Sequence, residues 1–149
     1  MKNWQSVVSL LVFVLMVLVA SPVMASSLES NVLQLVNAER IAAGCQPLTI
    51  DNQLMAAADI RSSEAGEVFA HQRPDGSSVK SVLQGASYSH FGENLAASQS
   101  VNAHAVVAAW MQSPTHRANI LNRHYTKMGV SCTMSADGHV YWAQEFACD

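Results

Sequence analysis

The stretch that decides the fold class runs over residues 128–146 and reads MGVSCTMSADGHVYWAQEF. From Met128 to Met134, every second residue is apolar or a thiol, which is typical of a β-strand with one buried face. Residues 136–138, Ala-Asp-Gly, then predict a turn. Apolar side chains return at Val140, Trp142 and Phe146. The stretch therefore predicts an antiparallel hairpin at the C-terminal end of the chain.

The chain before this hairpin carries helical patterns. A capping box formed by Ser26 and Glu29 predicts a first helix over residues 28–43. A second helix, rich in alanine, is expected to begin near Asp51 and to run toward Gly66. Its many small side chains predict close packing against a neighbouring element.

The middle of the chain is expected to contain turns, one short helix and two further helices. The segment HQRPDGSS, residues 71–78, predicts a turn whose last serines cap a short helix reaching Gly85, and a loop through Tyr88 and Phe91 is expected to follow. Ser100 is expected to open a helix that ends at Pro114, where the next helix begins. Helices followed by an antiparallel hairpin predict an α+β fold, with helices packed on an antiparallel sheet.

Residues 1–25 have the pattern of a secretory signal peptide. Lys2 precedes an apolar run, and small residues ending at Ala25 mark the expected cleavage site. An uncleaved membrane anchor is the alternative, but the run is short against the roughly 20 residues that a bilayer requires. We therefore expect residues 26–149 to form one domain, secreted or periplasmic, without a stable membrane anchor after cleavage.

The charge of this domain excludes one class of partner. Removal of Lys2 leaves seven basic and eleven acidic residues, and no basic cluster stands out. Proteins that bind nucleic acids normally present such a cluster, so we do not expect a nucleic-acid partner. The domain also contains three cysteines, Cys45, Cys132 and Cys148. In an oxidising compartment they predict one disulfide and one remaining thiol.

Three segments place a polar side chain at a helix edge or in a glycine-bearing loop. They contain His71, Glu93 and His116, which lie far apart in the sequence. Two neutral imidazoles and one carboxylate can share a divalent metal and leave a position open for water. Their spacing is too long for a local metal motif, so a structural role for each residue stays open as well. Ser113, just before Pro114, is expected to act as a helix cap.

The same segments carry a family resemblance. The ordered motifs VNAERIAAG, HQRPDGS, GENLA, AWMQSPTHRANIL, MGVSC and YWAQEF resemble the bacterial branch of the CAP superfamily, the cysteine-rich secretory, antigen 5 and pathogenesis-related domain. The resemblance covers nearly all of residues 26–149. It implies a three-layer α-β-α sandwich with an open cleft, in which two histidines and two acidic residues face each other.

Residue by residue, the resemblance implies which side chains line the cleft. His71 matches the first histidine, Glu93 the first glutamate and His116 the second histidine. Many eukaryotic relatives have a second glutamate shortly after the tryptophan that corresponds to Trp110, and here that position is Ser113. The resemblance therefore implies a set of three ligands, His71, Glu93 and His116, for zinc or another divalent metal.

The function that the resemblance implies is binding in the cleft, with a divalent metal, a small ligand or a peptide as the partner. A metal-dependent hydrolase acting on peptide or cell-envelope material is one alternative, although the second acid is missing. A carrier of sterol or other lipid, and a module that interacts with a host or another protein, are the others. Whether the protein is an enzyme stays open from the sequence.

The resemblance also bears on the cysteines. Bacterial relatives often have a cysteine at the position of Cys45, paired with one near the segment that here reads NILN. That segment contains no cysteine, but a hairpin closed at residues 136–139 would place Cys148 roughly opposite Lys127, a little further along the chain. We therefore expect a Cys45–Cys148 disulfide, and a Cys132–Cys148 disulfide is the alternative.

Overall fold

A computed structural model describes residues 27–149 of the chain. The signal peptide expected over residues 1–25 and its cleavage site lie outside the described residues, and so does Ser26. The elements of the described part are α1 (Leu28–Ala42), β1 (Thr49–Ile50), α2 (Asn52–Glu67), the 3₁₀ helix η1 (Val79–Leu83), β2 (His90–Ser98), α3 (Ala103–Gln112), α4 (Pro114–Ile120), β3 (Lys127–Met134) and β4 (Val140–Cys148). Of the five predicted helices, four form as α1, α2, α3 and α4, and the short one after residues 71–78 forms as the 3₁₀ helix η1. The C-terminal hairpin is confirmed as well.

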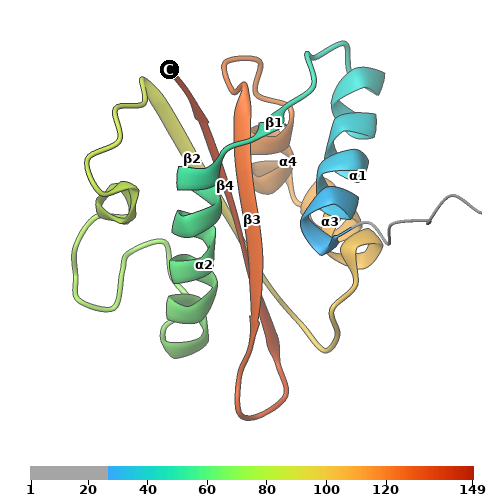
Figure 1. Cartoon of the computed structure of the whole chain (residues 1–149). Helices are drawn as coiled ribbons and strands as arrows, with labels where there is room; N and C mark the ends of the chain where they lie inside the picture. Colours follow the sequence, from blue (N-terminus) through green and yellow to red (C-terminus); the bar gives the residue numbers. More distant parts are fainter. Residues whose placement is uncertain (1–26) are drawn as a thin grey trace, which may run out of the picture.

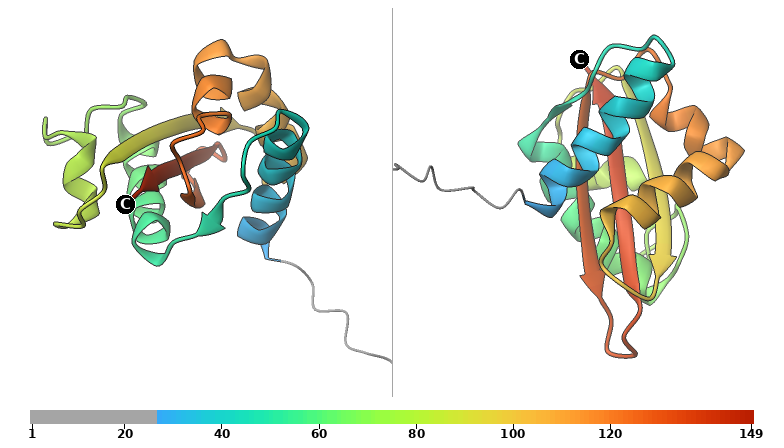
Figure 2. Two further views of the ribbon diagram at one scale, coloured as in Figure 1. Left: turned by 90° about the horizontal axis from the view of Figure 1, so that it is seen from above. Right: turned by 90° about the vertical axis from the view of Figure 1, so that its right-hand side faces the viewer.

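The fold is a three-layer α-β-α sandwich, as the resemblance implied. The sheet has the strand order β1-β3-β4-β2, and α2 packs on β3 and β4 from one side. Helices α1, α3 and α4 cover the other face (Figures 1 and 2). The expected antiparallel sheet is corrected in one respect, because the short strand β1 pairs with β3 in the parallel direction.

The hairpin of β3 and β4 forms with a register slightly shifted from the expected one. Lys127 lies opposite Ala147, not opposite Cys148. The loop is longer than expected because it includes Ser135, whose N–H donates to the carbonyl of His139 at 2.8 Å. Gly138 supplies the positive φ of 85° that this tight loop requires.

Strand β2 replaces the loop that the sequence analysis expected around Phe91. It pairs with β4 along its whole length and forms one edge of the sheet. Gly92 is required there because the hydroxyl of Tyr125 occupies the space that a Cβ atom would fill. The segment HFGENLAAS lacks β-branched residues and regular apolar alternation, so local sequence does not indicate a strand. Pairing with β4 produces it.

Helix α2 lies unusually close to the sheet. A Cβ atom at Gly129 of β3 would collide with the backbone of Leu54 in α2. The face of α2 that meets the sheet consists largely of buried small residues, including Ala57, Ala58 and Ala65. The close packing that the alanine-rich sequence predicted is therefore confirmed.

The helix caps differ in detail from the expected ones. Ser27 caps α1 by accepting a hydrogen bond from the N–H of Ser30. Helix α3 begins later than expected, with Asn102 as its N-cap. Ser113 stands at the N-cap position of α4, but its side chain makes no capping hydrogen bond. The fixed φ of Pro114, at the first helical position, is sufficient to start this short helix.

The expected Cys45–Cys148 disulfide is not formed, because all three cysteines are free thiols. The sulfur of Cys45 is directed at the carbonyl oxygen of Leu121 at 3.4 Å. The sulfur of Cys148 instead lies 3.2 Å from the Ser89 hydroxyl oxygen and 3.5 Å from Nδ1 of His90. The two thiols thus contact different segments of the fold.

Among residues 27–149, no helix combines the length and the apolar character needed to cross a membrane.

Candidate functional site

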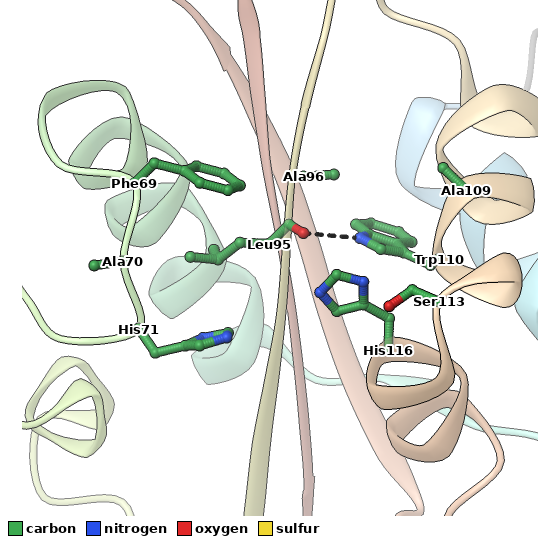
Figure 3. A pocket seen from close by; sticks show the side chains of 9 residues that line it. All are labelled: Phe69, Ala70, His71, Leu95, Ala96, Ala109, Trp110, Ser113 and His116. Carbon is green, nitrogen blue, oxygen red and sulfur yellow. Dashed lines mark hydrogen bonds between the residues drawn. The ribbon is translucent and has the colours of Figure 1, made fainter.

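A pocket of about 350 Å³ lies over the edge strand β2, where the resemblance implied a cleft. Figure 3 shows His71 on one side of β2 and His116 on the other, with both imidazoles directed toward the pocket. The lining is Phe69, Ala70, His71, Leu95, Ala96, Ala109, Trp110, Ser113 and His116. The pocket is thus mostly apolar, with two imidazoles as its main polar groups.

His71 lies in the loop that follows α2, and its ring is held by Glu93 of β2. Nδ1 of His71 is 2.8 Å from Oε1 of Glu93. The His71 side chain is 65% exposed, whereas the Glu93 side chain is only 3% exposed. A buried carboxylate therefore fixes an exposed imidazole by one nitrogen. When that nitrogen donates to the carboxylate, Nε2 carries the lone pair.

Glu93 is in turn held by Arg61 of α2. Nε and Nη2 of Arg61 donate to the two Glu93 oxygens at 2.7 and 3.2 Å. Nη2 also donates to the carbonyl of Ala70 at 2.6 Å, which ties the loop of His71 to the helix. The pKa of Arg61 is raised, because its hydrogen bonds to Glu93 and Glu64 outweigh the opposing effect of burial.

A second ion pair extends this network toward the turn at residues 71–78. Glu64 of α2 accepts from Nη1 of Arg61 at 2.6 Å and from Nη2 of Arg73 at 2.5 Å. Burial opposes its ionisation, but the hydrogen bonds from Arg73 and Arg61 lower the pKa of Glu64. The segment that carries His71 is therefore fastened to α2 at Ala70 and again at Arg73.

His116 lies in the first turn of α4 and is supported by neutral groups. Its carbonyl accepts a hydrogen bond from Nδ2 of Asn94 at 3.1 Å, and Asn94 also bonds Gln144 and Asn119. Nδ2 of Asn119 donates to the carbonyl of Glu93 at 3.1 Å. Burial, with a smaller contribution from the charge of His71, lowers the pKa of His116. The neutral form of this imidazole is therefore favoured.

The position of the missing second glutamate is occupied by Ser113, whose hydroxyl lies 3.3 Å from the hydroxyl of Thr115. Trp110 forms part of the same wall, and its indole N–H donates to the carbonyl of Leu95 at 3.3 Å, as the dashed line in Figure 3 shows. The wall of α3 and α4 thus supplies an aromatic surface, and it carries the Ser113 hydroxyl at the position for which the resemblance to eukaryotic relatives implied a second acid.

The structure brings His71 and Glu93 into direct contact. It places His71, Ser113 and His116 in the lining of one pocket, whereas Glu93 lies behind His71 and does not line it. Across residues 27–149, no group of three or more His, Cys, Asp or Glu side chains has the arrangement of a metal site. The three-ligand set therefore stays a prediction. Both oxygens of Glu93 already accept hydrogen bonds, which favours a supporting role for this residue.

Two neighbours of Glu93, Arg61 and Glu145, were not predicted from the sequence. Arg61 is fully buried and lies on the same face of α2 as Leu54, Ala58 and Ala65. An arginine within such an apolar stripe is a signal that a buried acid faces it. Glu145 of β4 is also fully buried and pairs with Glu93 across the sheet. Glu145 alternates with Ala143 and Ala147, so the three side chains lie on one face of β4. A carboxyl group on an otherwise apolar strand face was the signal that it has a special partner.

Comparison with known proteins agrees with this architecture. Residues 33–146 match the family model described as CAP, the cysteine-rich secretory protein family. The chain belongs to this family. It is 37% identical over 131 residues to the protein YkwD of Bacillus subtilis (strain 168). This match covers 85% of the chain and 49% of YkwD, so the chain spans about half the length of this curated relative.

Solved structures of CAP proteins share the fold. An extracellular protein of Bacillus anthracis str. Ames that contains an SCP domain is 25% identical, with a TM-score of 0.71 over 82% of this chain and 40% of that one. The protein NaASP2, whose crystal structure contains Zn²⁺, is 13% identical, with a TM-score of 0.63 over 81% of this chain and 80% of that one. The second likeness concerns the fold alone.

Proposed function

We propose that this CAP domain is secreted and that it binds a divalent cation in the pocket, between His71 and His116. The apolar stretch and small residues of positions 1–25 and the extracellular relative support the location. The two imidazoles support the cation, since neutral imidazole is the commonest protein ligand for zinc. The Zn²⁺ in NaASP2 is consistent with this choice of metal.

The observation that carries the proposal is the 2.8 Å contact between Nδ1 of His71 and Glu93, with Glu93 held by Arg61. Histidines that bind metals usually donate their other ring N–H to a carboxylate or a carbonyl, which sets the tautomer and the ring orientation. His71 has this arrangement, so its Nε2 is the nitrogen that would bind the cation.

His116 completes the pair of ligands from the opposite wall. Its lowered pKa favours the neutral imidazole, which is the form that binds a metal. We assign Glu93 to the orientation of His71, because its oxygens are bonded to Arg61 and His71. Bound zinc would supply a Lewis acid for an oxygen or nitrogen donor of a ligand.

The apolar lining indicates which part of a ligand would lie beside the cation. Phe69, Leu95 and Trp110 form the floor and two walls of the pocket (Figure 3). They suit an aromatic or aliphatic group of a small ligand or a peptide side chain. We do not assign a hydrolytic reaction, because Glu93, the acid nearest the pocket, is bonded to Arg61 and Ser113 replaces the second acid.

Calorimetric titration of residues 26–149 with zinc tests the proposal. We expect stoichiometric binding that weakens at least about tenfold, or ~1.4 kcal/mol, in His71→Ala and in His116→Ala. The variant His104→Ala/His124→Ala removes two exposed histidines outside the pocket and should bind like the wild type. Binding should also fade as the pH falls below the ordinary histidine value of 6.5, because protons compete with the cation for His116, whose pKa is lowered by burial.

Two results would contradict the assignment. Unchanged affinity in both single variants would show that the cation binds elsewhere, and full binding at pH 5 would point to carboxylate ligands. Absence of binding in the wild type would instead make the contact between His71 and Glu93 structural. The search would then move to lipid and protein partners.

A further inference from the structure

Glu145 is an anomaly in the interior of the protein. It lies in the central strand β4, its residue is 0% exposed, and neither carboxylate oxygen has a hydrogen-bond donor among the described residues. An ionised carboxylate without a donor is one of the most costly groups to bury. Because Glu145 has no such donor, it must be accommodated in the interior in some way other than as a hydrogen-bonded anion.

The backbone places Glu145 directly beside Glu93. The two residues are cross-strand partners in β2 and β4. The carbonyls of Glu93 and Leu95 accept hydrogen bonds from Asn119 and Trp110, so both carbonyls face away from β4. Glu93 and Glu145 thus form a non-hydrogen-bonded pair of an antiparallel ladder, in which the side chains are especially close.

The two carboxyl groups do not have the same neighbours. Glu93 is bonded by Nε and Nη2 of Arg61 and by Nδ1 of His71. Glu145 faces Glu93, which is itself an acceptor. Two acceptors can form a hydrogen bond only if one of them carries a proton. Since Glu93 has the donors, the proton belongs on Glu145.

We propose that Glu145 is a carboxylic acid that donates a hydrogen bond to Glu93, and that it positions Glu93 and, through it, the ring of His71. Glu145 is a positioning residue, because it does not line the pocket. Its neutral state leaves one anion, Glu93, for the guanidinium of Arg61. The effect on cation binding rests on the proposed function, whereas the proton on Glu145 does not.

The electrostatic environment agrees with this geometry. Burial and the negative charge of Glu93 raise the pKa of Glu145 well above its ordinary value, and the opposing effect of Arg61 does not cancel them. Like charges in one buried site do not both ionise. The difference in donors decides which of the two keeps the proton.

Infrared spectroscopy of the metal-free protein at neutral pH tests the proton directly. We expect a carbonyl band of a protonated carboxylic acid in the wild type and its loss in Glu145→Gln. The exposed Glu39 provides the matched control, and Glu39→Gln should keep the band. A wild type without the band, or a band that survives in Glu145→Gln, would overturn the proposal.

Two variants separate positioning from packing. In Glu145→Gln the amide N–H can replace the acid O–H as the donor to Glu93, so zinc affinity and the ¹⁵N signals of His71 should match the wild type. In Glu145→Leu the donor is lost, and we expect shifted His71 signals and roughly tenfold weaker zinc binding, as for other groups that support a metal ligand. Equal behaviour of the two variants would refute the positioning role.

The two proposals can fail separately. A wild type that binds no zinc contradicts the proposed function, but the infrared band and the His71 signals still decide the state of Glu145. If Glu145→Leu does not fold, the infrared comparison of the wild type with Glu145→Gln still decides whether Glu145 carries the proton. His71 ¹⁵N signals that differ between these two proteins would then refute the positioning role, because the amide of Gln should replace the acid as the donor.

Discussion

The two walls of the pocket hold their histidines by different means. His71 is supported by charged groups, in the chain Glu93, Arg61, Glu64 and Arg73. His116 is supported by the neutral amides of Asn94, Asn119 and Gln144. The two networks lie on opposite faces of the sheet, because adjacent residues of β2 point to opposite sides. Glu93 and Asn94 are the neighbouring residues that begin them.

The difference follows from how each histidine is attached to the fold. His71 lies in a loop, and its ring is largely exposed, so a strong charge-assisted hydrogen bond is needed to fix its orientation. His116 belongs to a helix, so α4 fixes its backbone, and the amides only have to hold α4 against β2. We call Glu93, Arg61, Glu64 and Arg73, which support His71, the charged wall, and Asn94, Asn119 and Gln144, which support His116, the amide wall. The stability of the protein should therefore respond strongly to a loss of charge in the charged wall, and it should depend little on charge in the amide wall.

The largest effect is expected from Arg61→Met. This change leaves Glu93 and Glu64 without the guanidinium that they share, and removing one partner of a buried ion pair typically costs about 3–5 kcal/mol. The free energy of unfolding, measured in urea, should fall by this amount. Arg117→Met, at an exposed position of α4, is the control. A loss below about 1 kcal/mol, the value of a surface ion pair, would mean that the charged wall does not hold the fold.

A smaller effect is expected from Asn119→Ala. It removes the hydrogen bonds to the Glu93 carbonyl and to Asn94, and an unsatisfied buried polar group costs about 1–3 kcal/mol. Since no charge is lost, the change in unfolding free energy should be the same at low and high salt. Gln112→Ala, at an exposed position of α3, serves for comparison. If the change in unfolding free energy depended strongly on salt, charge would contribute to the amide wall as well, and the two walls would not differ in this respect.

The smallest effect is expected for the pH dependence of stability, which changes through His116 beside the amide wall. The lowered pKa of His116 means that the folded state binds fewer protons than the unfolded state as the pH falls below the ordinary value of 6.5. The metal-free protein should therefore lose stability in this range, and His116→Asn should lose less. Melting temperatures between pH 7 and pH 5 test this. Parallel curves for the two proteins would mean that His116 titrates normally in the fold.

Much of the site could be predicted from local sequence. The turn before His71, the Ser-Pro start of the helix of His116 and the segment GENLA around Glu93 are all short-range signals. The meeting of His71 and His116 in one pocket, with Glu93 bonded to His71, was expected only from the family resemblance, because such long spacings do not identify a site by themselves. The expected cysteine pairing was wrong, because the thiols of Cys45 and Cys148 contact different segments of the fold, which the sequence does not indicate.

The partners of Glu93 could not be predicted in the same way. Arg61 lies in α2, well before Glu93 in the sequence, and Glu145 lies in β4, well after it. Each of them is a charged residue at an otherwise apolar position of its own element. Such a residue indicates a special site, but it does not show which residue is its partner. Strand β2 was missed for a related reason, because its pairing with β4 outweighs its weak local preference.

Elements with strong local signals could be read from the amino-acid sequence. These are the helices with apolar stripes and proline or serine starts, and a hairpin with alternating apolar residues, together with the residue types that the pocket contains. The folded arrangement was needed to see that Glu93 orients His71, that Arg61 neutralises Glu93 and that Glu145 lies beside Glu93. The physical reason is that ionisation and hydrogen bonding depend on which groups share a buried space, and distant segments come to share that space only through folding.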